Sequence, residues 1–252
     1  MTAPVLRLGT WQRALKDQTC DAWISDPPYS AKTHEGHNRA RSADGSKRRT
    51  LDYGHLTPAQ VAAIVASWSP RTRGWMVALC DDVLSPVWAR EFEKAGRFVF
   101  AGLPIIWPGM TVRQQGDGPS REAIWMVAAR PRNNVFACWG TLRGFYSTAR
   151  DSWSEQQGGK PLALMEALVR DYSRHGDVVV DPFGGQGTTL LAAARMGRIG
   201  IGAEVDPENH ARGVAALAKA WTPDLFEAFA ASGRRTKPQL PPDMFGDDET
   251  ST

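Results

Sequence analysis

The sequence predicts an α/β protein in which helices cover one mostly parallel sheet. Short apolar runs with the composition of buried strands alternate along the chain with longer amphipathic stretches, which is the element order of an α/β fold. One strand leads through a glycine-rich turn into a helix, an arrangement that seats nucleotides and anions. The 252 residues, 42% of them hydrophobic, suffice to bury a substantial core.

Each element follows from its local pattern. We expect strands at residues 5–8, 21–25, 74–79, 98–107, 123–129, 178–181 and 199–203. We expect helices at residues 57–68, 83–95, 160–172, 188–196 and 208–221. The strands at 98–107 and 123–129 are joined by the glycine-containing loop 108–121, so they form the antiparallel hairpin of the sheet.

The most informative stretch is Asp26-Pro27-Pro28-Tyr29, which follows the apolar run 22–25. Asp26 and Pro27 each precede a proline, which favours extended backbone, and neither proline has an N–H that competes for acceptors. The Asp26 carboxylate and the Pro27 carbonyl can therefore face one site. Two acceptors suit an exocyclic amino group, which has two N–H donors, and Tyr29 offers a face for a heterocycle. The alternative is an ordinary strand-to-loop turn.

A second motif follows the strand at 178–181. Residues 182–187 form a tight glycine-rich turn, and a helix begins at Thr188. The glycines let backbone approach a ligand, and the free N–H groups of the helix start favour a carboxylate or phosphate. The next strand ends in Glu204, about 17 residues beyond Gly187, near the spacing at which an acid reaches ribose hydroxyls. Such a seat suits NAD, but S-adenosylmethionine also presents a carboxylate and a ribose.

These motifs resemble those of the DNA amino-methyltransferases, which methylate N6 of adenine or N4 of cytosine. Residues 26–29 are similar to their catalytic tetrapeptide, residues 181–189 to their S-adenosylmethionine loop, and Lys160-Pro161 to the segment just before that loop. The catalytic motif precedes the cofactor motif, which is similar to the family's β-type, circularly permuted order. The resemblance covers about residues 5–218 and implies a Rossmann-like S-adenosylmethionine-dependent methyltransferase sheet.

The resemblance also implies roles for individual residues. The catalytic residues are Asp26, Pro27, Pro28 and Tyr29, and the cofactor-binding residues are Thr10, Lys160, Asp181, Phe183, Gly185, Gly187, Thr188 and Glu204. Lys160 is placed near the methionine moiety or at the end of the sheet. Two departures from the family pattern bear on cofactor affinity more than on the chemistry. Gln186 stands where a small residue is usual, and Gly9-Thr10 stands where the family often has Gly-Asp.

We expect methyl transfer from S-adenosylmethionine to N6 of adenine in double-stranded DNA. The adenine flips out of the duplex and stacks on Tyr29. Hydrogen bonds from N6 to Asp26 and to the Pro27 carbonyl free the nitrogen lone pair and stabilise the positive charge that grows during in-line attack. The alternatives are cytosine N4, adenine in RNA or a free nucleotide, and a non-catalytic nucleic-acid-binding subunit.

Positive charge is concentrated in one segment, although the net charge is only +3. Residues 30–55 predict a long mobile loop that contacts DNA phosphates, with a solvated insertion as the alternative. Its basic residues are Lys32, Arg39, Arg41, Lys47, Arg48 and Arg49. Residues 30–56, 108–121 and 131–159 are then the DNA-contacting loops of a methyltransferase domain spanning residues 1–231. Their small extent predicts a short or degenerate target sequence.

The remaining patterns exclude several classes. The apolar runs are too short to span a membrane and the N-terminus lacks a signal peptide pattern, so we expect a cytoplasmic protein. The sequence is compatible with a homodimer. Cys20, Cys80 and Cys138 form no CxxC pair and are expected in the core. The run 34–37 lacks the histidine spacing of a zinc protease, so no metal is expected. Residues 232–252 have the composition of a disordered tail.

Overall fold

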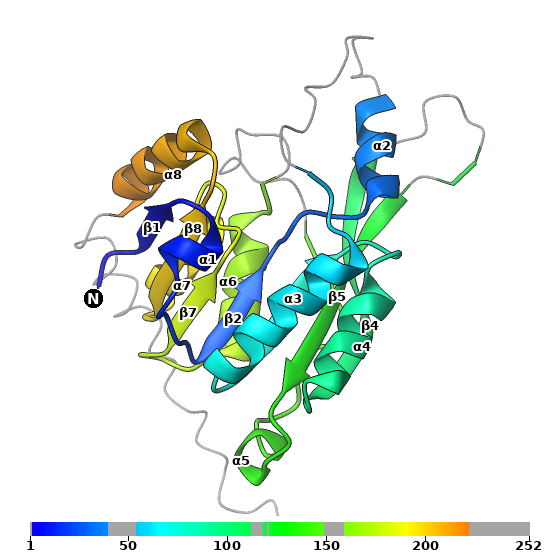
Figure 1. The fold of residues 1–252 in the computed structure, drawn as a ribbon, viewed down its shortest axis with the longest axis horizontal. Coiled ribbons are helices and arrows are strands. Elements are labelled where there is room, and N and C mark those ends of the chain that lie inside the picture. Colours follow the sequence, from blue (N-terminus) through cyan, green and yellow to red (C-terminus); the bar gives the residue numbers. More distant parts are fainter. Residues whose placement is uncertain (1, 40–53, 112–117, 120, 149–158, 222–252) are drawn as a thin grey trace, which may run out of the picture. The chain divides into compact units, whose positions relative to one another are not determined.

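One eight-stranded sheet organises the part of the chain that the computed structural model describes, namely residues 2–39, 54–111, 118–119, 121–148 and 159–221 (Figure 1). Its strands lie in the order β1 (Val5–Leu8), β8 (Ile199–Glu204), β7 (Val178–Asp181), β2 (Ala22–Ser25), β3 (Met76–Cys80), β5 (Arg121–Arg130), β4 (Phe98–Thr111) and β6 (Tyr146–Ser147). Neighbouring strands are parallel except where β5 pairs with β3 and β4. The expected mostly parallel sheet with an antiparallel hairpin is therefore confirmed.

Helices cover both faces of this sheet. In Figure 1, α3 and α4 lie in front of the sheet, whereas α6 and α7, which contact each other, lie behind it. The helix α8 contacts β1 and β8 at one end of the sheet. The helical elements are α1 (Trp11–Ala14), α2 (Ala31–Arg39), α3 (Pro58–Trp68), the 3-10 turn η1 (Ser69–Arg71), α4 (Ser85–Lys94), α5 (Asn134–Ala137), α6 (Leu162–Tyr172), α7 (Thr188–Arg195) and α8 (Pro207–Ala220).

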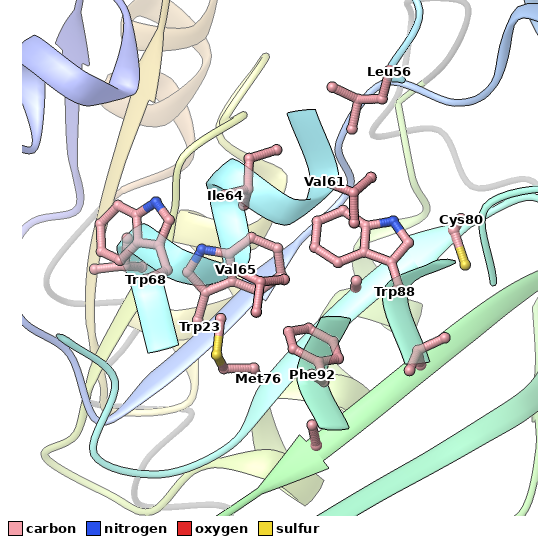
Figure 2. Packing of buried hydrophobic residues seen from close by; sticks show 14 of the residues in the cluster. Trp23, Leu56, Val61, Ile64, Val65, Trp68, Met76, Cys80, Trp88 and Phe92 are labelled. Carbon is pink, nitrogen blue, oxygen red and sulfur yellow. The ribbon is translucent and has the colours of Figure 1, made fainter. Parts of the chain in front are cut away.

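The core beneath α3 and α4 is rich in tryptophan (Figure 2). Trp23 of β2 and Trp88 of α4 are fully buried with ring centroids 5.8 Å apart, and Trp68 closes the cluster from α3. The helix α3 begins with a capping box, because Thr57 and Gln60 each accept a hydrogen bond from the backbone N–H of the other. This packing fixes β2 and β3, the strands that carry half of the site described below.

The structure corrects the prediction that residues 30–55 form a loop, because Ala31–Arg39 is the helix α2. The sequence of α2 is polar, so it lacks the periodic apolar residues by which an amphipathic helix is predicted. Its first turn is instead held by hydrogen bonds to Asp81, 48 to 51 positions away along the chain. Residues 40–53 lie outside the described residues.

Two further corrections concern the hairpin and the cysteines. The strand β4 continues to Thr111 and β5 begins at Arg121, so the ends of the expected loop 108–121 belong to strands. The pairing shifts register between Ile106 and Thr111, which lets β4 accommodate proline and glycine. Cys20 and Cys80 are buried as expected, but Cys138 is exposed because it ends the surface helix α5. None of the described helices is both long and apolar enough to cross a membrane.

Candidate active site at the carboxyl edge of the sheet

The carboxyl ends of five neighbouring parallel strands meet at one edge of the sheet. At this edge β2 leads to Asp26, β3 to Asp81, β7 to the glycine loop (residues 182–187), β8 to Glu204 and β1 to Thr10. The chain leaves β2 towards β3 on one side and leaves β7 towards β8 on the other. The β2–β7 boundary is thus the point where the strand order reverses, and open α/β sheets bind ligands at such a point.

Asp181 joins the two halves of this edge. Its buried carboxylate accepts hydrogen bonds from the Ser25 hydroxyl at 2.5 Å, the Thr189 hydroxyl at 2.6 Å and the Phe183 N–H at 3.0 Å. Burial raises the pKa of Asp181 to about 6, although these three bonds act in the opposite direction. The role of Asp181 in cofactor binding, implied by the family resemblance, stays a prediction. Its observed contacts hold the glycine loop against β2, the strand that carries the tetrapeptide.

The glycine loop is shaped by backbone conformations that favour glycine. Gly185 and Gly187 have φ of +52° and +80°, and the Gly187 N–H donates to the Gly184 carbonyl at 2.7 Å. A Cβ on Gly185 would meet no atom within 4 Å, so open space lies beside this backbone. The helix α7 starts at Thr188 without a side-chain cap on its first turn. Its N-terminal N–H groups are thus not satisfied by a capping side chain.

The loop is also packed tightly from behind. A Cβ on Gly213 of α8 would lie 2.8 Å from the Gly185 carbonyl oxygen and 2.7 Å from Leu6 Cδ2. A Cβ on Gly184 would lie 2.8 Å from Leu6 Cδ1. These distances are shorter than a real side chain allows, so glycine at both positions sets how closely β1 and α8 approach the loop. Phe183, which half-buries its ring, packs against the core cluster.

Glu204 and Thr10 lie at the ends of the adjacent strands β8 and β1. The Gly9 N–H donates to the Glu204 carbonyl at 2.8 Å, which aligns the two positions. The Glu204 side chain accepts one bond through Oε1, from the Asp206 N–H at 2.8 Å, and is half-buried. Thr10 is exposed and, as the N-cap of α1, makes no side-chain capping bond. The structure thus brings both residues to the same edge as the glycine loop.

Asp26 is held from two sides. Lys160 Nζ donates to its Oδ2 at 2.6 Å, and the Tyr29 hydroxyl donates to its Oδ1 at 3.0 Å. The Lys160 ammonium also lies 5.1 Å from the centroid of the Tyr29 ring. Burial, followed by the nearby Asp26 carboxylate, raises the pKa of Tyr29 well above its usual value, so this phenol stays protonated as a donor. The pairing of Lys160 with Asp26 was not predicted from the sequence.

Asp81, directly after β3, was missed by the sequence analysis. Its Oδ2 accepts from the Ser30 N–H at 3.0 Å, the Ser30 hydroxyl at 2.5 Å and the Thr33 hydroxyl at 2.6 Å, and its Oδ1 accepts from the Leu84 N–H at 2.9 Å. Burial alone would raise the pKa of Asp81, but these hydrogen bonds outweigh it and lower the pKa. Asp81 therefore anchors the residue that follows Tyr29. The signal in the sequence that could have identified Asp81 is its position immediately after a buried strand.

The structure describes only part of the predicted DNA-binding set. Lys32 is exposed on α2 and pairs with Asp82 at 3.3 Å. Arg39 ends α2. The residues Arg41, Lys47, Arg48 and Arg49 lie outside the described residues. His34 is buried and packs edge-on against His55, with ring centroids 6.2 Å apart. Within the described ranges, no three His, Cys, Asp or Glu side chains gather closely enough to hold a metal ion.

The fold and the paired motifs define an α/β protein of the methyltransferase class, and comparison with known families narrows the assignment. The DNA methylase family model for N6 and N4 methylases matches residues 81–215, more than half of the chain. The chain therefore belongs to the DNA amino-methyltransferase family. The match includes the glycine loop and Lys160, whereas the Asp26 tetrapeptide precedes it.

Known structures and relatives agree with this family. The crystal structure of an M1.HpyAVI complex with S-adenosylmethionine has a TM-score of 0.60 at 22% identity and covers 84% of this chain and 98% of that one. The cytosine-N4-specific PvuII DNA methyltransferase has a TM-score of 0.60 at 16% identity, over 92% and 94% of the two chains. These likenesses concern the fold. M2.DpnII of Streptococcus pneumoniae is 41% identical over 122 residues, 48% of this chain. The matched segments span well under half the length of the curated relatives.

Proposed function

We propose that this protein transfers a methyl group from S-adenosylmethionine to N6 of adenine in DNA. The observation that carries the proposal is the hydrogen bond between Ser25 and Asp181, which holds the end of β2 beside the glycine loop after β7. The amine-binding tetrapeptide and the nucleotide seat thus share one site at the point where the strand order reverses. A site with these two parts suits a reaction between a nucleotide-like cofactor and an amino group.

The residues present fit the cofactor. The first turn of α7 lacks a side-chain cap, so its N–H groups and the helix dipole would hold the methionine carboxylate. Glu204 uses Oε1 for the Asp206 N–H, and its second oxygen would accept from a ribose hydroxyl. The open space beside Gly185 lets the ligand contact backbone. When bound, S-adenosylmethionine would supply an electrophilic methyl group carried on a sulfonium. Loss of that methyl group would leave the sulfur as a neutral thioether.

The tetrapeptide prepares the amine. Asp26 and the Pro27 carbonyl accept the two N6 hydrogens, which draws the nitrogen towards tetrahedral geometry and makes its lone pair available. The nitrogen lone pair would then take up the methyl group, and the nitrogen would become cationic. Asp26 stabilises this charge and accepts the proton that leaves to give the neutral methylated amine. Tyr29 supplies the face on which the flipped base stacks, while its hydroxyl fixes Asp26.

Two observations bear on the choice of base. A carboxylate is a stronger acceptor than a hydroxyl, and an acid at the first position of the tetrapeptide is typical of adenine-specific members of the family, which favours adenine. Cytosine N4 is the second candidate, because the cytosine-N4-specific PvuII enzyme has a similar fold over most of this chain. Both amines are conjugated to a ring, so the mechanism at Asp26 is the same for either base.

Labelled cofactor provides the test. The purified protein is incubated with S-adenosylmethionine labelled in the methyl group and with either unmethylated duplex DNA or RNA of matched sequence, and the digested nucleosides are separated. We expect label in N6-methyladenine from DNA. Label only in N4-methylcytosine would replace adenine by cytosine, and label only in RNA would replace the nucleic acid. Asp26→Asn, which keeps the side-chain shape, should abolish labelling. Label absent from every nucleoside of the wild-type reaction would overturn the proposal.

A further inference from the structure

Lys160 occupies the place that the proposed function gives to the target amine. The residue lies just before α6, 134 positions from Asp26 in the chain. Its ammonium donates to Asp26 Oδ2 at 2.6 Å and lies 5.1 Å from the centroid of the Tyr29 ring. Only 10% of the Lys160 side chain is exposed. One cation therefore makes two of the three contacts that the proposed function gives to the flipped base, the hydrogen bond to Asp26 and the approach to Tyr29.

We propose that Lys160 is a positioning residue that takes the place of the target amine at Asp26 and moves away when the base enters. The inference rests on the proposed function, because it assigns to the base the contacts seen for the ammonium. An ammonium and an exocyclic amine are both N–H donors, so either can satisfy the same carboxylate oxygen. Base capture is then an exchange of one donor for another at Asp26.

This exchange has a physical reason. A partly buried carboxylate without a partner is unfavourable, and Asp26 has only 23% of its side chain exposed. The ammonium keeps the carboxylate satisfied and holds it in one orientation together with the Tyr29 hydroxyl. The side chain of lysine has four flexible methylene groups, so the charge can withdraw without movement of α6. The Asp26 carboxylate is thus oriented before the base binds, and part of the affinity for the base is spent on displacing Lys160.

The inference predicts that removal of the ammonium strengthens base capture. Lys160→Met keeps an unbranched side chain of similar length but has no donor, so the base meets an Asp26 with no competitor. Lys160→Arg keeps the positive charge and continues to compete. Lys94→Met is the matched control, because Lys94 also pairs with an acid, Glu91, but does so on the exposed surface of α4. A cofactor role for Lys160 predicts instead that Lys160→Met weakens S-adenosylmethionine binding.

The experiment measures affinity for two end-labelled duplexes by fluorescence anisotropy without cofactor. One duplex carries the base that the labelling experiment finds methylated, in its sequence context, and the other has an abasic site at that position. The ratio of the two dissociation constants isolates the contacts of the base, since phosphate contacts are common to both duplexes. We expect Lys160→Met to shift this ratio towards the base-containing duplex by about tenfold, the change that corresponds to about 1.4 kcal/mol. The ratio should stay unchanged for Lys160→Arg and Lys94→Met.

Calorimetry with S-adenosylmethionine and thermal unfolding complete the test. Cofactor affinity of Lys160→Met within about threefold of the wild type, less than 1 kcal/mol, supports the inference. A base ratio that is unchanged or falls in a folded Lys160→Met protein would overturn it, and a simultaneous loss of cofactor affinity would assign Lys160 to the methionine moiety. If Lys160→Met does not fold, Lys160→Arg provides the test. A ratio of dissociation constants that Lys160→Arg shifts towards the base-containing duplex would overturn the inference. A wild-type protein that labels no nucleoside would overturn the proposed function and this inference together, whereas an active wild type confines any failure to Lys160.

Discussion

The hydroxyl of Ser25 lies 2.5 Å from Asp181 Oδ1, and this bond links β2 to β7 at the carboxyl edge of the sheet. Ser25 directly precedes Asp26, and Asp181 directly precedes the glycine loop. The two motifs are more than 150 residues apart in the sequence, but one buried carboxylate holds them in register. Asp181 and Asp81 are both buried acids at this edge, yet their pKa values shift in opposite directions, and this contrast leads to two predictions.

Asp181→Asn should remove a pH-dependent loss of stability. The folded-state pKa of Asp181 is raised to about 6 from 3.8, so its protonated form stabilises the fold at low pH. That contribution is present below about pH 4 and is lost as the pH rises through 6, on the order of 2 kcal/mol in unfolding free energy. The amide keeps an acceptor for Ser25 and Phe183, and its NH2 can donate to the Thr189 hydroxyl. Urea unfolding of the wild type and of Asp181→Asn between pH 4 and 7 measures the difference in unfolding free energy. Unfolding free energies that change with pH in the same way for both proteins would contradict the raised pKa of Asp181.

Asp81→Asn should be destabilising and should slow methyl transfer. One oxygen of Asp81 faces the Leu84 N–H and the other faces the Ser30 N–H, so either orientation of an amide places its NH2 against a backbone donor. We expect a loss of about 1–3 kcal/mol in unfolding free energy, because a buried donor remains unsatisfied. The affinity for S-adenosylmethionine should change little, since the Asp81 bonds are to Ser30, Thr33 and Leu84, none of which belongs to the glycine loop.

The Asp81 contribution also has the opposite pH sign to that of Asp181. Its pKa is lowered on folding, so its stabilising effect is present above the ordinary carboxyl pKa and disappears as the pH falls through the folded-state value. Asp82→Asn is the matched control for stability, because Asp82 pairs with Lys32 at the exposed surface. Equal unfolding free energies for Asp81→Asn and Asp82→Asn would contradict the anchoring role of Asp81.

The sequence predicts the parts of this molecule that depend on local pattern. The apolar run of β7, the glycines after it and the acid that ends β8 were expected at the observed positions, because strand composition and turn chemistry are local properties. The pair of Lys160 with Asp26 depends on tertiary structure alone, so residue spacing could not reveal it. The helix α2 was missed for the same reason, since the acid that holds its first turn comes from the connection after β3. Short elements such as α5 and β6 have too few residues to show a period.

Gly213→Ala should weaken cofactor binding from outside the pocket. The new Cβ would lie 2.8 Å from the Gly185 carbonyl oxygen, so either α8 or the glycine loop must shift. We expect a loss of about tenfold in S-adenosylmethionine affinity, while the better helix propensity of alanine, about 1 kcal/mol, offsets part of the clash in overall stability. Gly144→Ala is the control, because a Cβ there meets nothing within 4 Å and needs no left-handed backbone. Calorimetry that finds equal affinities for the two variants would place the cofactor away from this loop.

Asp82→Ala and Lys32→Ala should change DNA affinity in opposite directions. Lys32 is exposed on α2, beside the proposed base pocket, and pairs with Asp82 at 3.3 Å. If Lys32 contacts a phosphate, it must exchange Asp82 for the DNA, so loss of Asp82 strengthens binding to every sequence. Loss of Lys32 weakens binding on every sequence and lowers the salt slope by about one phosphate contact. Both changes should alter unfolding free energy by less than about 1 kcal/mol, as is usual for exposed ion pairs.

Anisotropy titrations from low to high salt measure the slope, with Lys94→Ala as the control for an exposed paired lysine elsewhere. A salt slope for Lys32→Ala equal to that of Lys94→Ala would remove Lys32 from the DNA-binding surface.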